Sequence, residues 1–186
     1  MGKANWNKLK EGLEKYQSIM NRYNESNEIS SSDDFQKSFR KFYGMNRAGF
    51  SADCYKEYFK LLDKARVNKD IDFKFVLQRL HEKSGKKHFS FTTKLLATVN
   101  PSLPVWDRKV REYLNYKYDL KFKASFKDVE SCEQEYKRYC NWFIEFLKTD
   151  EAKKHIDEFD KKIPNLKITK MKKIDLMFWQ MEYSKK

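Results

Sequence analysis

The stretch HFSFTTKLLATVNPSLPVWDRKVREYL, residues 88–114, decides the fold, because two helical patterns meet there at a turn with two prolines. Apolar residues recur at helical spacing over about residues 91–99. Pro101 ends this run, because the residue before a proline avoids the α region. A second helix is expected over 107–118. The sequence leaves two roles for Asp107, which either caps that second helix only or is also held out toward a substrate.

The same three- and four-residue spacing of apolar side chains runs through almost all of the chain. No strand pair, glycine-rich phosphate loop or internal repeat is visible in the sequence. It therefore predicts an all-α fold of about eight to nine helices without a sheet. We expect one domain over residues 1–186, or one domain with two lobes. The other expected helices cover residues 6–23, the segment between Ser31 and Gly44, the segment from Ser51 through Leu62, residues 72–84, residues 125–149, a short charged stretch that ends at Lys162, and residues 172–183.

The charge balance of the chain favours a polyanionic partner. Of 186 residues, 40 are Lys or Arg and 27 are Asp or Glu, which gives a formal net charge of +13. Apolar residues make up 40% of the chain and aromatic residues 16%, enough for a folded core rather than a disordered basic tail. Clustered lysines and arginines attract phosphates, so a nucleic acid is the favoured partner. The alternative, a lysine-rich composition without functional meaning, stays open.

Cysteine and histidine usage argues against a metal centre. Cys54, Cys132 and Cys140 form no C-x-x-C pair, and only three histidines are scattered along the chain. We therefore expect no metal and no small-molecule cofactor, with thiols that are buried and reduced. No apolar run approaches the length of a membrane span, and the first residues lack an apolar segment, so the sequence predicts a cytoplasmic protein with no membrane partner.

The turn GKKHFS, residues 85–90, joins two expected helices and suggests a phosphate-binding hairpin. Backbone N–H groups at the start of a helix, together with the helix dipole, favour a phosphate at such a place. Ser90 is also a candidate cap for the second helix. An ordinary helix–helix connection with solvated lysines is the alternative. The residues expected to contact nucleic acid here are Gly85, Lys86, Lys87, His88 and Ser90.

The order of hairpin, helix, short loop and P-V-W-D-x-x-V resembles the helix-hairpin-helix DNA glycosylase superfamily, in which a P-V-D-x-x-V type segment carries an essential aspartate. The resemblance covers mainly residues 73–114. FYGMNRAGF, residues 42–50, and KKIDLMFWQ, residues 172–180, resemble features of a divergent bacterial glycosylase-like branch. The resemblance implies a helix-hairpin-helix bundle that binds duplex DNA and removes a damaged or mismatched base, with Asp107 as the catalytic residue.

Two departures from that family's pattern bear on the chemistry. The usual hairpin reads L-P-G-x-G, whereas this one has the single glycine Gly85. Bifunctional members carry a Schiff-base lysine about eighteen residues before the aspartate, and that count falls on Phe89. Lys87 lies two residues away, and Lys94 is too close to the aspartate. The count predicts a monofunctional enzyme, and Lys87 would be catalytic only in a bifunctional one.

The implied reaction needs a fixed carboxylate. Loss of a base builds positive charge on the deoxyribose, and a carboxylate near C1′ stabilises that charge and can orient or deprotonate the attacking water. The nucleotide must first be extruded into a pocket. Arg108 is expected to contact phosphate. Asn46 and Arg47 have an alternative role as hydrogen-bond donors to loop carbonyls. The residues expected to form the base pocket or a wedge are Tyr43, Asn46, Arg47 and Trp106.

The alternatives for Asp107 and for the whole chain remain open at this point. Asp is among the best N-cap residues, and Asp107 would accept the N–H of Lys109 or Val110; capping and catalysis do not exclude each other. The first function hypothesis is a monofunctional DNA N-glycosylase. The second is a non-catalytic helix-hairpin-helix protein that binds DNA, and a weaker third is an interaction protein for which the positive charge is incidental.

Overall fold

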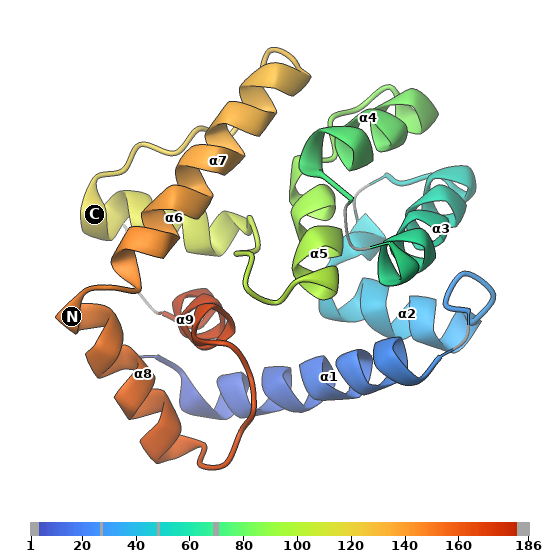
Figure 1. The fold of residues 1–186 in the computed structure, drawn as a ribbon. Helices are drawn as coiled ribbons and strands as arrows, with labels where there is room; N and C mark the ends of the chain where they lie inside the picture. The colour runs from blue at the N-terminus through green and yellow to red at the C-terminus, as the bar shows by residue number, and fades with distance from the viewer. Residues whose placement is uncertain (1–3, 27, 48, 69–70, 182–186) are drawn as a thin grey trace. The chain divides into compact units, whose positions relative to one another are not determined.

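The computed structural model describes residues 4–26, 28–47, 49–68 and 71–181 (Figure 1). Within these ranges the chain forms nine α-helices and one short 3-10 helix, and no strand. Ala4 and Met181 form an isolated antiparallel bridge. The predicted all-α fold class is therefore confirmed for the described part of the chain. None of the helices in this part has the length and apolar character that crossing a membrane requires.

Backbone contacts divide the chain into two compact units. The hairpin unit comprises residues 11–99, and the aspartate unit comprises residues 1–10 and 100–186. The first turn of α1 (Trp6–Glu25) falls in the aspartate unit and the rest of that helix in the hairpin unit.

The hairpin unit has an aromatic core. α2 places aromatic rings four residues apart, so Phe35 and Phe39 point the same way and pack on Phe59 of α3. Tyr58 is fully buried beside them and donates its hydroxyl to the Phe91 carbonyl at 3.2 Å. The elements of this unit after α1 are α2 (Asp33–Phe42), η1 (Met45–Arg47), α3 (Ala52–Val67), α4 (Phe73–Ser84) and α5 (Phe89–Val99).

The aspartate unit is built around its last helix. Every residue of α9 from Met171 to Phe178 is buried, and this helix packs against α6 and α8. A helix buried on all sides is usually apolar all round, yet this one carries Lys172, Lys173 and Asp175. The helices of this unit are α6 (Arg108–Tyr118), α7 (Val129–Phe146), α8 (Asp150–Lys162) and α9 (Lys170–Trp179).

The starts of α2 and α7 show why helix boundaries differ from the sequence prediction. The cap of α2 is Ser32, whose hydroxyl accepts the Phe35 N–H, while the Ser31 hydroxyl donates to the Glu28 carbonyl. The predicted helix over 125–149 is shorter, because the Asp128 side chain accepts the N–H of the third helical residue and starts α7 at Val129. Each helix starts after the side chain that accepts a backbone N–H of the first turn, and several nearby side chains could have done so.

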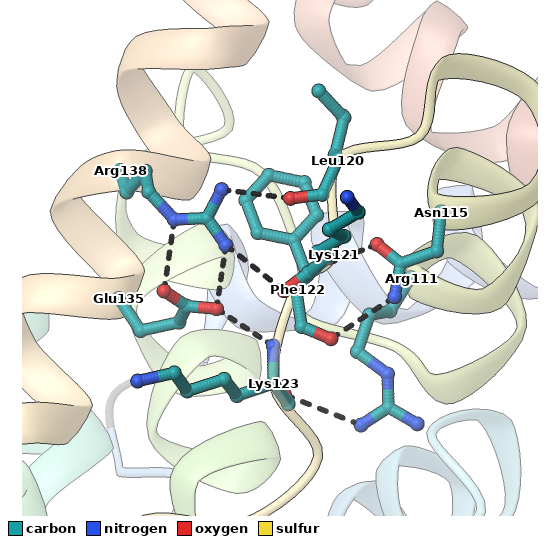
Figure 2. A network of polar contacts seen from close by, with 8 residues as sticks. All are labelled: Arg111, Asn115, Leu120, Lys121, Phe122, Lys123, Glu135 and Arg138. Carbon is teal, nitrogen blue, oxygen red and sulfur yellow. Dashed lines mark hydrogen bonds and ion pairs between the residues drawn. The ribbon is translucent and has the colours of Figure 1, made fainter.

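The loop between α6 and α7 is fixed by a polar network inside the aspartate unit (Figure 2). Glu135 of α7 accepts two hydrogen bonds from Arg138 at 2.8 and 2.9 Å and one from the Lys123 N–H at 2.7 Å. Arg138 also donates to the carbonyl of Leu120 at 3.0 Å. Burial by itself would raise the pKa of Glu135, but the bonds from Arg138 and Lys123 lower it below its ordinary value. The carboxylate is therefore held in its ionised form.

The other side of this loop is tied to α6 (Figure 2). The Asn115 side chain accepts the Phe122 N–H at 2.7 Å and donates to the Phe122 carbonyl at 3.0 Å. Asp119 and Lys121 have positive φ values of 51° and 55°, a conformation that costs a non-glycine residue energy. The hydrogen bonds from α6 and α7 hold the loop in that conformation.

Candidate functional site

The hairpin turn, residues 84–88, is closed by bonds within itself. Gly85 is left-handed with φ 67°, which glycine adopts without strain, and its N–H donates to the His81 carbonyl at 2.7 Å. The Ser84 hydroxyl donates to the Leu80 carbonyl and accepts the N–H of Lys86. Gly85 and Lys86 are exposed and Lys87 is half-buried. The turn thus presents its basic side chains at the end of α4.

α5 begins earlier than the sequence predicted. Phe89 is its first residue, and the His88 carbonyl accepts the N–H of Thr92 at 2.9 Å. Ser90 is the second residue of α5, so the prediction that Ser90 caps this helix from outside is wrong. Burial, followed by the charge of Lys86, lowers the pKa of His88 to about 4. At neutral pH His88 is therefore uncharged, and it cannot contact phosphate as a cation.

The loop after α2 lies beside the hairpin turn within the same unit. The Lys86 ammonium lies 3.9 Å from the position that a Cβ on Gly49 would occupy, and the Phe50 ring meets the His88 ring edge-on at 4.4 Å. Asn46 is exposed, whereas the Arg47 side chain lies outside the described part of the structure. Gly49 and Phe50 of this loop therefore lie against the hairpin turn.

Tyr43 and Lys94 form a buried contact at the end of α2. The Lys94 ammonium donates to the Tyr43 carbonyl at 2.9 Å and lies 5.1 Å from the centre of the Phe91 ring. Tyr43 is the C-cap of α2, where the helix dipole favours a positive charge. Lys94 is only 5% exposed, so its ammonium is engaged in holding the start of the loop. Tyr43 is likewise buried, and its hydroxyl lies 3.5 Å from Thr98 Oγ1.

The aspartate turn, residues 101–107, is held by side chains from distant helices of its own unit. Tyr136 of α7 donates its hydroxyl to the Pro104 carbonyl at 3.0 Å, and Tyr139 donates to the Val105 carbonyl at 3.1 Å. Burial raises the pKa of Asp175 on α9, and the Val105 backbone opposes this rise by a smaller amount. The Thr169 hydroxyl, just before α9, donates to the Pro101 carbonyl at 2.6 Å. Both ends of the turn are therefore fixed.

Asp107 ends this turn and caps α6, as the sequence predicts. Its Oδ1 accepts the Lys109 N–H at 2.8 Å, and its carbonyl accepts the Arg111 N–H at 2.9 Å. The residue is half-buried, so part of it reaches solvent, and the neighbouring Arg108 is exposed. Asp107 therefore caps α6 while part of the residue stays accessible to solvent.

Trp106 has a different place from the one its sequence neighbourhood suggested. It is only 4% exposed, and its ring packs on Tyr139 at 4.7 Å and on Phe122 at 5.7 Å between ring centres. Such a ring fills the core of the aspartate unit and has little surface left for an extruded base. Its burial makes Trp106 an anchor for the aspartate turn and does not favour a role in the base pocket.

A buried ion pair lies behind the aspartate turn. Lys172 and Asp175 approach to 2.9 Å, with only 3% and 8% of their side chains exposed. Burial, opposed by the Lys172 charge, raises the pKa of Asp175, and the Asp107 charge raises it further. Sequence reasoning singled out residues 172–180 only for their resemblance and missed this pair. The signal was available as opposite charges three residues apart in an otherwise apolar helix.

The residues that the sequence singled out therefore fall into two groups. Gly85, Lys86, Lys87 and His88 form the hairpin turn of the hairpin unit, which also contains Asn46, while Asp107, Arg108 and Trp106 belong to the aspartate unit. Over the ranges that the structure describes, no group of three or more His, Cys, Asp or Glu side chains gathers in a way that could hold a metal ion.

Comparisons with known proteins identify no relative of this chain. No protein-family model, no curated protein and no solved structure matches this chain. The resemblance to the helix-hairpin-helix glycosylases therefore rests on the motif residues themselves.

Proposed function

We propose that the protein binds duplex DNA and acts as a DNA N-glycosylase that removes a damaged or mismatched base without a lysine nucleophile. The observation that carries this proposal is the fixed turn before Asp107. Hydrogen bonds from the hydroxyl groups of Tyr136 and Tyr139 hold the backbone that leads to this carboxylate. A charge held in place before the reaction stabilises a transition state without paying for reorganisation.

The proposed reaction replaces the base by water at C1′ of the sugar. The C1′–N bond breaks and its electron pair leaves with the base, while a C1′–O bond forms to water. The negative charge of Asp107 stabilises the positive charge on the sugar, and the carboxylate orients the water and takes up its proton. The half-buried position of Asp107 leaves it within reach of such a substrate.

The proposed mechanism uses no lysine nucleophile because of where the lysines near the hairpin lie. Phe89, at the position counted for that nucleophile, is buried in the first turn of α5. Lys94 is buried with its ammonium on the Tyr43 carbonyl. Lys87, half-buried in the hairpin turn, is the lysine that a bifunctional mechanism would have to use.

DNA binding is assigned in this proposal to the hairpin turn and to Arg108. Lys86 and Arg108 are exposed, and the chain carries a net charge of +13. Positive side chains on a turn at a helix start attract phosphate through both their charge and the nearby N–H groups.

A second candidate is a DNA-binding protein without turnover. Asp107 already serves as the cap of α6, and Trp106 is too buried to line a base pocket. The hairpin also keeps one glycine where the family pattern has two. This candidate shares the DNA-binding surface with the first and differs only in the chemistry.

The two candidates are separated by a panel of duplexes, each with one damaged or mismatched base, incubated with the protein and then cleaved with alkali at abasic sites. Cleavage of at least one duplex by the wild type, and by no more than background with Asp107→Asn, supports the glycosylase. Binding without cleavage of any duplex supports the second candidate. A borohydride-trapped adduct that disappears in Lys87→Ala would instead show a bifunctional enzyme.

A further inference from the structure

The end of α6 and the loop that follows it gather positive charge in the aspartate unit. Residues 117–127, which we call the lysine loop, contain four lysines and one aspartate, so positive charges exceed negative ones by three. All five of these charged residues are exposed, namely Lys117, Asp119, Lys121, Lys123 and Lys127. The lysine loop is separate in sequence from both the hairpin turn and Arg108.

The carboxylates nearest to the lysine loop do little to offset its charge. The Glu135 side chain is only 8% exposed and pairs with Arg138 at 2.8 Å, so its charge is matched within the network of Figure 2. Asp119 lies 3.5 Å from the Lys121 ammonium, but both side chains are about four-fifths exposed. An ion pair so open to water contributes little and can exchange for another partner. The positive charge of the lysine loop is therefore available to a partner in solvent.

The backbone of the lysine loop is fixed before any partner arrives. Arg138 donates to the carbonyls of Leu120 and Lys121 at 3.0 and 3.4 Å (Figure 2). Arg111 donates to the Lys123 carbonyl at 3.5 Å. A loop that is already ordered loses less conformational entropy when it binds. These bonds therefore favour binding through a preformed row of lysines.

The lysine loop packs against the aspartate turn of the same unit. Phe122 is buried, and its ring lies 5.7 Å from the Trp106 ring between centres. The Phe126 ring meets the same indole edge-on at 6.1 Å. Trp106 directly precedes Asp107 in the chain. Two rings of the lysine loop thus contact the residue next to the candidate catalytic carboxylate.

We propose that the lysine loop is a second DNA-contact surface, which binds backbone phosphates beside the aspartate turn. The inference rests on the proposed function for the identity of the partner, duplex DNA. A lysine ammonium binds phosphate as a point charge and carries no information about the base. The lysine loop therefore holds the sugar-phosphate backbone at the aspartate turn and leaves the choice of base to other residues.

Three double variants of the full chain separate this role from a general effect of charge. Lys121→Gln/Lys123→Gln removes two charges from the loop and keeps long polar side chains. Lys153→Gln/Lys154→Gln removes two charges from exposed lysines of α8 in the same unit and serves as the matched control. Lys121→Arg/Lys123→Arg keeps the charges of the loop. If net charge alone mattered, the two glutamine variants would bind DNA alike.

The experiment measures affinity for an undamaged, fluorescently labelled DNA duplex at several salt concentrations. For Lys121→Gln/Lys123→Gln, the slope of log affinity against log salt is expected to flatten by about one unit per lost phosphate contact, hence by about two units if both lysines bind. The α8 control and the arginine variant are expected to keep the wild-type slope. A loop variant whose slope is no flatter than that of the α8 control would overturn the proposal. An arginine variant as flat as the glutamine variant would also overturn it, because the charge would then not be what the loop supplies.

Base release on the panel of damaged duplexes keeps this inference apart from the proposed function. If the wild type binds duplex DNA and cleaves none, the glycosylase proposal fails, and the salt slopes still decide on the lysine loop. If bases are released and Lys121→Gln/Lys123→Gln keeps the wild-type slope, the glycosylase proposal stands and the lysine loop is refuted as a DNA contact. A wild type with no affinity for duplex DNA would overturn both.

Discussion

The hairpin turn and the aspartate turn are stabilised in opposite ways. The hairpin turn is closed by Gly85 and by the Ser84 hydroxyl, with partners no more than four residues away. The aspartate turn is held by Tyr136, Tyr139 and Thr169, which are 32, 34 and 68 residues from their partners. The bonds that close the first turn are specified by its local sequence, whereas those of the second require the rest of its unit to be folded.

Lys94 and Lys172, a buried lysine from each unit, differ in the groups that stabilise their charge. Lys94 donates to the Tyr43 carbonyl at the end of α2 and lies near aromatic rings, so a helix dipole supports its charge. Lys172 is neutralised by the carboxylate of Asp175. A backbone carbonyl and aromatic rings therefore stabilise Lys94, whereas a carboxylate stabilises Lys172.

The largest effect is expected for Asp107→Asn. Asn caps a helix about as well as Asp, so the free energy of unfolding should change by less than about 1 kcal/mol. Base release should fall by about 100-fold or more, because the charge that stabilises the sugar is lost. Thermal unfolding and single-turnover cleavage measure the two quantities. Equal rates for wild type and variant would reduce Asp107 to a helix cap.

The next effect compares one tyrosine hydroxyl in each unit. Tyr139→Phe and Tyr58→Phe each leave a buried backbone carbonyl without its hydroxyl donor, which costs about 1–3 kcal/mol of unfolding free energy. Only Tyr139→Phe should also slow base release, because only this hydroxyl holds the aspartate turn. Denaturant unfolding gives the stability, and cleavage gives the rate. A comparable loss of rate in Tyr58→Phe would show that the turn needs no special support.

Unfolding at different pH values tests whether the Glu135 carboxylate stabilises the loop between α6 and α7. Glu135→Gln removes the charge that binds Arg138 and the Lys123 N–H, and we expect a loss of about 1–2 kcal/mol at neutral pH. Because the pKa of Glu135 is lower in the folded state, its contribution is fully present above the ordinary value of 4.5 and is lost as pH falls through the lowered value. Unfolding measured from pH 7 to pH 3 should show the wild type and the variant converging at acid pH. A difference that stays constant over this range would contradict an ionised Glu135.

The smallest effect on the fold is expected at the hairpin turn. Replacing Lys86 and Lys87 by Ala should leave stability nearly unchanged, because surface charges contribute little. Binding to duplex DNA should weaken with little dependence on sequence, and the slope of log affinity against log salt should flatten by about one unit per lost phosphate contact. Titrations at several salt concentrations measure this slope. An unchanged slope would remove the hairpin turn from the DNA-binding surface.

Sequence patterns were sufficient for the features that depend on neighbours along the chain. The helical spacing predicted the all-α fold class, and the residue type at Asp107 predicted its role as a cap on the Lys109 N–H. Where several capping residues adjoin, as at Ser31 and Ser32, the pattern could not choose between them, because the choice depends on backbone angles.

The tertiary structure decided what surrounds Asp107. Trp106 is buried against Phe122 and Tyr139, and the Tyr139 hydroxyl holds the turn from 34 residues away. No local pattern describes these contacts. Helices and caps follow from interactions between residues three or four positions apart, which a sequence displays directly. The environment of a carboxylate follows from long-range packing, and that exists only once the helices of its unit have come together.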